Sequence, residues 1–172
     1  MSLKLVNGRG QVGSYIRQMD LTGIDINHDV YVYHTWNVKD KSKNNQKKEY
    51  KKFQEFVNKT KSRIIFVSTK TENKTWYTYY KQKAEAYLLL NHNNSVVLRF
   101  PTFIGRPCKL FEPNPTPYGE VELISIPDVC SEIIKYSCLL PDSELNIRVI
   151  NIKGELVSAK LIADILKFNS YE

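Results

Sequence analysis

A tyrosine and a lysine four residues apart, Tyr79 and Lys83, have types and spacing that suit acid/base chemistry. Residues four apart on a helix lie on one face, so the phenol and the ammonium would be neighbours. A nearby positive charge favours the phenolate and lowers a tyrosine pKa that is otherwise about 10. Such a tyrosine can exchange a proton with a substrate hydroxyl near neutral pH. The spacing alone is a weak signal, because the chain has 11 tyrosines.

Two elements would have to position this pair. The apolar run at 64–67 is too short for a helix and rich in β-branched residues, so it predicts a buried strand. Ser68 and Thr69 follow it, at the end of the strand that faces the ligand crevice in open α/β sheets. The stretch 78–90 predicts a helix that carries the tyrosine and the lysine. The sequence therefore predicts a hydroxyl, a phenol and an ammonium in one crevice.

A glycine-rich stretch at 7–13, Asn-Gly-Arg-Gly-Gln-Val-Gly, predicts a phosphate-binding turn. It follows a short strand at 3–6 and opens an amphipathic helix at 12–19. Glycines at such a junction let the backbone approach a pyrophosphate, and the helix adds free N–H groups and the positive end of its dipole. The residues expected to contact a dinucleotide in this stretch are Gly8, Arg9, Gly10, Gln11, Val12 and Gly13.

The rest of the chain alternates between strand and helix patterns. Further strands are expected at 30–33, 95–101, 121–126 and 147–152, and further helices at 45–58, from Asp128 and from Ser158. Such alternation is typical of an α/β fold with a mostly parallel sheet and right-handed crossovers. The segment 108–118 has three prolines and no periodicity, which predicts a loop. No repeat or domain boundary is evident, so residues 1–172 are expected to form one domain.

Taken in order, these segments resemble the extended short-chain dehydrogenase/reductases, the branch of that family that acts on sugar nucleotides. The resemblance rests on the glycine loop, the strand that ends at His34, the Ser-then-Tyr-x-x-x-Lys segment, Leu98-Arg99-Phe100-Pro101, and Asn151-x-x-Gly154-Glu155-x-x-Ser158. It implies a shortened, three-layer Rossmann-like domain over 1–172 that binds NAD or NADP.

The resemblance also implies residue roles. In the family, the tyrosine is the general acid/base, the lysine lowers its pKa and holds the nicotinamide ribose, and a serine or threonine hydrogen-bonds the reacting sugar oxygen. Carried over, these roles fall on Tyr79, Lys83, and Ser68 or Thr69, with His34 beside the cofactor. The implied reaction passes a hydride between NAD(P) and a nucleotide-sugar carbon, as in an epimerase, dehydratase or 4-keto reductase.

Departures from the family pattern keep a second interpretation open. Asp25, the candidate for the acidic residue on the adenosine ribose, follows the glycines much sooner than the usual spacing of about 20 residues. Trp36 is bulky for a position beside the nicotinamide, and most of the family's substrate-binding segment is missing. The chain is either an NAD(P)-dependent oxidoreductase or epimerase, which we favour, or a reduced, non-catalytic Rossmann module that acts in binding or assembly.

Charge and composition bear on partners. The formal net charge is +7, but nine lysines lie within 39–61, where apolar residues recur at helical spacing and leave the lysines on a solvated face. This distribution disfavours nucleic acid as a partner. The three cysteines show no metal-ligand spacing, so no metal site is expected. A membrane span and an apolar leader are also lacking, which predicts a cytoplasmic location. Because the shortened fold would leave apolar surface uncovered, we expect a homo-oligomer.

Overall fold

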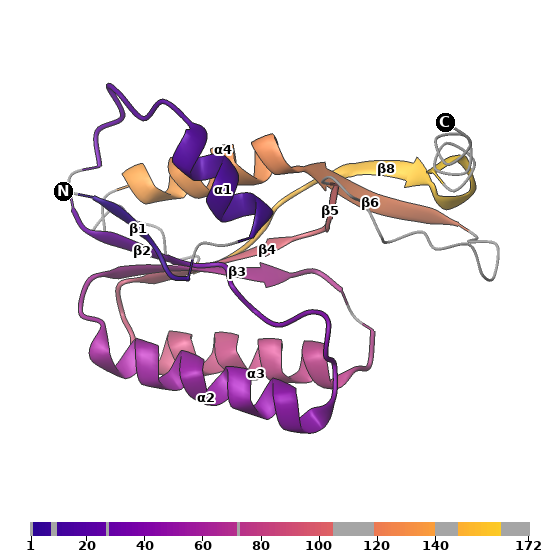
Figure 1. Cartoon of the computed structure of the whole chain (residues 1–172), viewed down its shortest axis with the longest axis horizontal. Helices are drawn as coiled ribbons and strands as arrows, with labels where there is room; N and C mark the ends of the chain where they lie inside the picture. Colours follow the sequence, from indigo (N-terminus) through magenta and orange to yellow (C-terminus); the bar gives the residue numbers. More distant parts are fainter. Residues whose placement is uncertain are drawn as a thin grey trace.

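The computed structural model of this chain describes residues 2–7, 10–26, 28–71, 73–104, 119–139 and 148–162. A five-stranded parallel sheet in the order β1-β2-β3-β4-β7 forms its centre (Figure 1). Its strands are β1 (Leu3–Leu5), β2 (Val30–Tyr33), β3 (Arg63–Thr69), β4 (Ser95–Phe100) and β7 (Val149–Asn151).

Helices cover both faces of this sheet, so the fold has three layers. On one face lie α1 (Gln11–Gln18) and α4 (Ile126–Cys138), and on the other lie α2 (Lys43–Lys59) and α3 (Trp76–Asn91) (Figure 1). Alternate residues of β3 serve the two cores: Ile65 and Val67 pack with α1 and α4, while Ile64 and Phe66 pack with α2 and α3. The Rossmann-like α/β fold with a parallel sheet, predicted from the alternating elements, is confirmed.

The helices begin where polar residues can accept from their first free N–H groups. Ser42 accepts from the third residue of α2, and Thr75 and Thr78 form a capping box at the start of α3. At α4 the cap is Ser125, whose hydroxyl accepts from Asp128 N–H. The sequence had placed the start of this helix at Asp128. The helix starts earlier because Pro127 suits its first turn, where no N–H is needed.

A second, three-stranded sheet consists of β5 (Thr102–Ile104), β6 (Glu120–Ser125) and β8 (Glu155–Ser158), in that order. Glu122 of β6 ties it to the main sheet. Its carboxylate accepts from Lys70 Nζ at 2.5 and 2.7 Å and from Gly154 N–H at 2.8 Å. These hydrogen bonds hold residues 70, 122 and 154 together near the carboxyl end of β3.

Gly154 sits where the backbone of β6 comes close, which gives a first prediction. A methyl group at Gly154 would overlap the Leu123 carbonyl and come within 2.8 Å of Pro101 Cγ. Because backbone atoms cannot move aside cheaply, Gly154→Ala is expected to cost about 3 kcal/mol of unfolding free energy. Urea denaturation would measure this, with Gly10→Ala as the control, because a methyl group there meets nothing within 4 Å. Equal effects of the two substitutions would contradict the close approach.

The first crossover of the main sheet differs in hand from the two that follow it. Strands β1 to β4 are neighbours in chain order, so each connection steps in the same direction across the sheet. Helix α1 nevertheless lies on the opposite face from α2 and α3 (Figure 1). The β1-α1-β2 connection therefore has the opposite hand to the next two connections. Parallel crossovers are right-handed in about 98% of cases, so the expectation of right-handed crossovers throughout is wrong for this chain.

Strand β1 is the outer strand of the main sheet, with no strand paired to its free edge in the part of the chain that the structure describes. Doubly wound folds continue beyond their first strand, and the change of direction there creates the crevice for a dinucleotide. In this chain α1 returns directly to β2. The half of the sheet that would carry the adenosine end of a dinucleotide is absent from the described residues.

Candidate functional site

The carboxyl ends of the parallel strands meet at one edge of the sheet. The α1 start at Gly10, His34 after β2, and Thr69 at the end of β3 all lie there. The connection from Thr69 to α3 begins at the same edge. Ligands of open α/β sheets bind outside this edge, so the candidate site is built from these segments.

The glycine loop joins β1 to α1, as predicted. Gly10 is the residue that precedes the helix, and no side chain of the described residues caps the helix start. No acidic residue lies in the first turn, so the positive end of the α1 dipole is not neutralised there. Asn7 has φ of 54°, the left-handed conformation that asparagine tolerates. Val12 and Gly13 are buried in the helix, while Gly8 and Arg9 lie outside the described residues.

A cavity of about 430 Å³ opens beside this helix start. His34 stands in its wall, and its buried Nε2 atom has no hydrogen-bond partner among the residues that the structure describes. Burial lowers the pKa of His34 to about 4, so the ring is neutral at physiological pH. A buried, unpartnered polar atom calls for an acceptor or donor from outside the chain. Residues of the cavity wall include Val6, Asn7, Gly10, His34, Thr35 and Trp36.

The inward face of α3 carries three polar residues at steps of four: Tyr77, Lys81 and Glu85. Lys81 and Glu85 are buried, and Tyr77 is half-buried. Lys81 Nζ donates to the Val67 carbonyl near the end of β3 at 2.6 Å. Tyr77 is one turn closer to the helix start, with its ring centroid 5.9 Å from the Lys81 ammonium. A tyrosine and lysine at the required spacing therefore do face the end of β3, two residues earlier than predicted.

Burial acts on both members of this pair. It lowers the pKa of Lys81 to about 7, although the carboxylate of Glu85 opposes the shift. It raises the pKa of Tyr77 to about 12. Both shifts favour the uncharged forms, as expected when water is excluded from an ammonium and a phenolate. In this conformation Tyr77 holds its proton and is suited to donate it rather than to accept one.

Tyr79 and Lys83, the pair selected from the sequence, lie on another face of α3. Tyr79 is 50% exposed and its ring packs on Trp76 and Tyr80. Lys83 is exposed and its Nζ lies 5.3 Å from the ring centroid of Tyr50 on α2. The predicted convergence with Ser68 is therefore not observed. The reason is helical geometry: residues two apart point about 200° away from one another.

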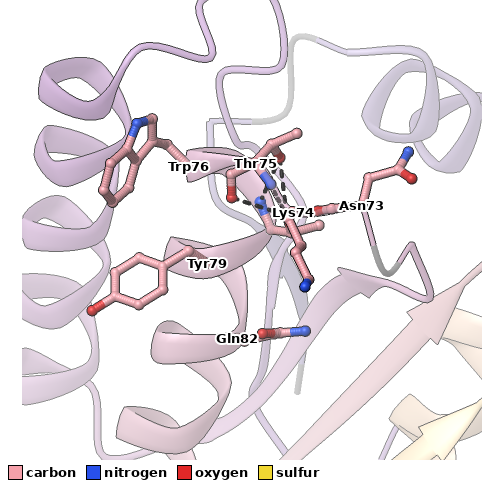
Figure 2. Close-up of a pocket in the computed structure, with 7 residues that line it drawn as sticks. Asn73, Lys74, Thr75, Trp76, Tyr79 and Gln82 are labelled. Atoms are coloured by element: carbon pink, nitrogen blue, oxygen red, sulfur yellow. Dashed lines mark hydrogen bonds between the residues drawn. The ribbon is translucent and has the colours of Figure 1, made fainter.

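Figure 2 shows Trp76 and Tyr79 projecting together from one side of α3. They belong to a shallow hollow of about 480 Å³ on the outer surface at the helix start. This hollow does not include Tyr77, Lys81 or any residue of β3. Its wall is formed by Asn73, Lys74, Thr75, Trp76, Thr78, Tyr79 and Gln82.

Ser68 and Thr69, the predicted hydroxyls, differ in their availability. Ser68 is buried and its hydroxyl donates to the Glu85 carboxylate. The same carboxylate accepts from Arg99 at 2.5 to 3.2 Å, which completes a network of three residues. Thr69 is half-buried at the strand end, and its oxygen accepts from Thr71 N–H at 3.2 Å. The Thr69 hydroxyl proton remains available at the site, whereas that of Ser68 is committed.

Asp25, predicted to hold the adenosine ribose, lies at the wrong edge of the sheet. It precedes β2, and Val30, the first residue of that strand, pairs with Leu3 at the start of β1. Asp25 therefore belongs to the amino edge, while Gly10 belongs to the carboxyl edge. The error came from counting residues after the glycines without knowing that α1 leads straight to β2.

The sequence contained the signal for Tyr77 and Lys81, because two Tyr-x-x-x-Lys spacings overlap at 77/81 and 79/83. Glu85 lies four residues after Lys81, so it continues the 77/81 spacing along the same helix face but not the 79/83 spacing. A lysine on a buried face is rare, so residue type alone does not mark Lys81 as a site residue. In the part of the chain that the structure describes, no group of His, Cys, Asp and Glu could hold a metal ion, and no helix is long and apolar enough to cross a bilayer.

Comparison with known proteins places the fold. No protein-family model and no curated protein sequence matches the chain. Among solved structures, a dTDP-4-dehydrorhamnose reductase from Clostridium acetobutylicum superposes with a TM-score of 0.72 at 12% identity, over 99% of this chain and 81% of that one. The enzyme WbmG from Bordetella bronchiseptica, in complex with NAD and UDP, gives 0.65 at 14% identity, over 97% and 77%.

A third match is to the capsular polysaccharide assembling protein CapF from Staphylococcus aureus, with a TM-score of 0.61 at 16% identity. It covers 96% of this chain, which spans only 56% of that protein. These matches are extended short-chain dehydrogenase/reductases. The chain has the fold of that family, and the resemblance predicted from its sequence is confirmed at this level.

The site fits part of a dinucleotide. The uncapped start of α1, the space around Gly10 and the unpartnered His34 suit a phosphate-bearing group. The acidic residue on the wall of this cavity is Glu49, whose carboxylate is paired with Lys52 Nζ at 2.8 Å.

Proposed function

We propose that this chain binds NAD or NADP at the start of α1 and acts as a nucleotide-sugar 4-keto reductase or epimerase, with Tyr77 and Lys81 as its acid/base pair. The observation that carries the proposal is the position of this pair. Lys81 is bonded to the end of β3, and Tyr77 lies one turn nearer the edge that faces the α1 start. The reductase and the NAD- and UDP-bound enzyme among the structural matches support the same class of reaction.

A bound nicotinamide would supply or accept a hydride, and the chain's own residues would manage the proton. Tyr77, with its pKa raised to about 12, is a proton donor suited to a carbonyl oxygen that gains negative charge. Lys81, with a pKa of about 7, can return a proton to Tyr77 near neutral pH. Thr69 can donate its hydroxyl proton to the same oxygen.

The second candidate is a non-catalytic Rossmann module, and two observations favour it. The Ser68 hydroxyl donates to Glu85 and cannot also donate to a substrate oxygen without breaking that bond. The strands that would hold the adenosine end are missing beyond β1 in the described residues. Under this proposal the glycine turn would bind a phosphate-bearing ligand or assist assembly, with no turnover.

Replacing Tyr77 with phenylalanine tests the enzyme proposal. Loss of a proton donor should lower kcat about 100-fold or more while the Kd for NADH or NADPH changes less than twofold, since the proton moves only in the transition state. Calorimetry would measure the Kd, and cofactor absorbance would follow turnover of dTDP- and UDP-4-keto sugars. Tyr79→Phe is the matched control and should leave both quantities unchanged.

Two outcomes would count against the enzyme. If NAD, NADH, NADP and NADPH all give neither heat nor thermal stabilisation at millimolar concentration, the non-catalytic module becomes the better account. If cofactor binds and Tyr79→Phe, rather than Tyr77→Phe, abolishes turnover, the acid/base assignment is wrong and the pair chosen from the sequence is restored.

A further inference from the structure

The Lys81 ammonium is covered by aromatic rings. Its Nζ atom lies 4.8 Å from the ring centroid of Phe66, 5.3 Å from that of Trp36 and 5.9 Å from that of Tyr77. Lys81 as a whole is only 4% exposed. Phe66 belongs to β3 and Tyr77 to α3, so both are parts of rigid elements. Trp36 belongs to the connection between β2 and α2, outside any helix or strand.

A buried glutamine holds Trp36 in place. The indole Nε1–H donates to Gln46 Oε1 at 2.7 Å, and Gln46 is fully buried in the first turns of α2. The Gln46 amide also donates to the carbonyls of Asn37 and Asp40, at 2.8 and 2.6 Å. The Gln46 side chain is thus bonded to the Trp36 ring and to two carbonyls of the connection between β2 and α2. Trp36 and Gln46 together form what we call the latch.

We infer that the latch controls access to Lys81: a ligand can reach the ammonium only when Trp36 leaves Gln46 and swings outward. This inference rests on the proposed function in that Lys81 belongs to its acid/base pair. It adds residues that no part of that proposal needs. Trp36 and Gln46 are positioning residues, because neither offers a group for the reaction and both act through the exposure of Lys81.

The direction of opening follows from what lies around Trp36. The ring packs on Phe53 and Phe66 on its inner side, with centroids 6.2 and 6.1 Å away. Trp36 is also part of the wall of the 430 Å³ cavity beside Gly10 and His34. When the ring swings away from Phe53 and Phe66, the wall between the Lys81 enclosure and this cavity is removed. A ligand that enters the cavity then reaches Lys81.

Site-specific acylation of Lys81 tests the latch without any cofactor. The folded protein is treated with a limiting amount of N-hydroxysuccinimidyl acetate, and peptide mass spectrometry gives the rate at each lysine. Lys81 should react at least 30-fold more slowly than exposed Lys83. Trp36→Ala should raise the Lys81 rate at least tenfold, and Gln46→Leu, which fills the same space but cannot accept the indole N–H, should raise it severalfold.

Matched controls separate opening of the latch from loss of fold. Trp76→Ala removes a tryptophan that does not contact Lys81, so the Lys81 rate should stay unchanged. Cys130 is buried between α1 and α4, and its thiol should remain unreactive in every folded variant. If Trp36→Ala unfolds the protein, Cys130 becomes reactive, and Gln46→Leu together with Trp36→Phe then decides the question.

Two results would overturn the latch. One is a Lys81 in the unmodified protein that reacts as fast as Lys83. The other is a folded Trp36→Ala or Gln46→Leu variant in which the Lys81 rate is unchanged. A failed enzyme proposal looks different: Lys81 becomes reactive in the variants, yet no nicotinamide cofactor binds to any of them. If the cofactor does bind, it should do so at least tenfold more tightly to Gln46→Leu, because no energy is needed to release Trp36.

Discussion

Lys81→Met is expected to make the protein more stable, by about 2 to 3 kcal/mol at pH 6. Burial lowers the pKa of Lys81 from 10.5 to about 7, because the charged ammonium is less stable in the folded protein than in water. At pH 6 Lys81 is still protonated, so folding must bury this charge. Methionine has a similar length, fills the same space and carries no charge. The lost hydrogen bond to Val67 O is a smaller term, of about 1 kcal/mol.

The stability difference between Lys81→Met and the unmodified protein should depend on pH, and its direction follows from the lowered pKa of Lys81. A base whose pKa is lowered on folding binds fewer protons in the folded state than in the unfolded state between pH 7 and about 10.4. The stability of the unmodified protein should therefore rise across that window relative to the variant. The advantage of Lys81→Met should be largest at pH 7 and below and nearly vanish at pH 10.

Urea denaturation of both proteins at pH 6, 8 and 9.5 measures the difference directly. Lys83→Met is the matched control, because Lys83 is exposed and its replacement should change stability by less than about 0.5 kcal/mol at every pH. A Lys81→Met variant that is less stable at pH 6 would show that Lys81 is better compensated than its contacts indicate. If turnover is detected in the unmodified protein, the stabilised variant should lack it, because replacing an active-site charge commonly raises stability and lowers activity.

The fold was readable from the sequence because its signals are local. The β-branched run at 64–67 and the apolar periodicity of 45–58 each specify one element, and the structure extends both by only a few residues. The alternation of strands and helices then limits the sheet to a few parallel arrangements. The short interval between the glycines and the strand at 30–33 did indicate that the usual second-strand region is missing, but it did not reveal the hand of the β1-α1-β2 connection. The assignment of Asp25 failed because α1 leads straight to β2.

The site was harder to predict because it depends on which way a helix faces. Tyr77 and Tyr79 differ by two positions, and residue type alone does not say which one turns toward β3. A periodic apolar pattern normally decides this, but α3 has polar residues on its inner face and aromatic residues on its outer face. Lys81 and Glu85 are buried there because Val67 O, Ser68 and Arg99 satisfy them. Such contacts are properties of the folded chain and cannot be counted along the sequence.

The network around Glu85 should be the costliest polar feature to break. The Glu85 side chain is 4% exposed, and Arg99 supplies its counter-charge with Nη2 at 2.5 Å from Oε2. Among the described residues, Arg99→Met leaves the buried carboxylate with Ser68 as its one hydrogen-bond donor. Because an unpaired buried charge is far more costly than the pair is favourable, we expect a loss of about 3 kcal/mol of unfolding free energy.

A double-mutant cycle shows whether this loss comes from the orphaned charge. Glu85→Gln keeps an acceptor for Ser68 but removes the charge, so Arg99→Met combined with Glu85→Gln should recover all but about 1 kcal/mol. Lys70→Met is the comparison, since the Lys70–Glu122 pair is about one quarter exposed on both sides and should be worth about 1 kcal/mol. Losses that simply add in the double variant would mean that Arg99 stabilises the protein through its packing, and that Ser68 alone is enough to hold Glu85 and keep its own hydroxyl from the substrate.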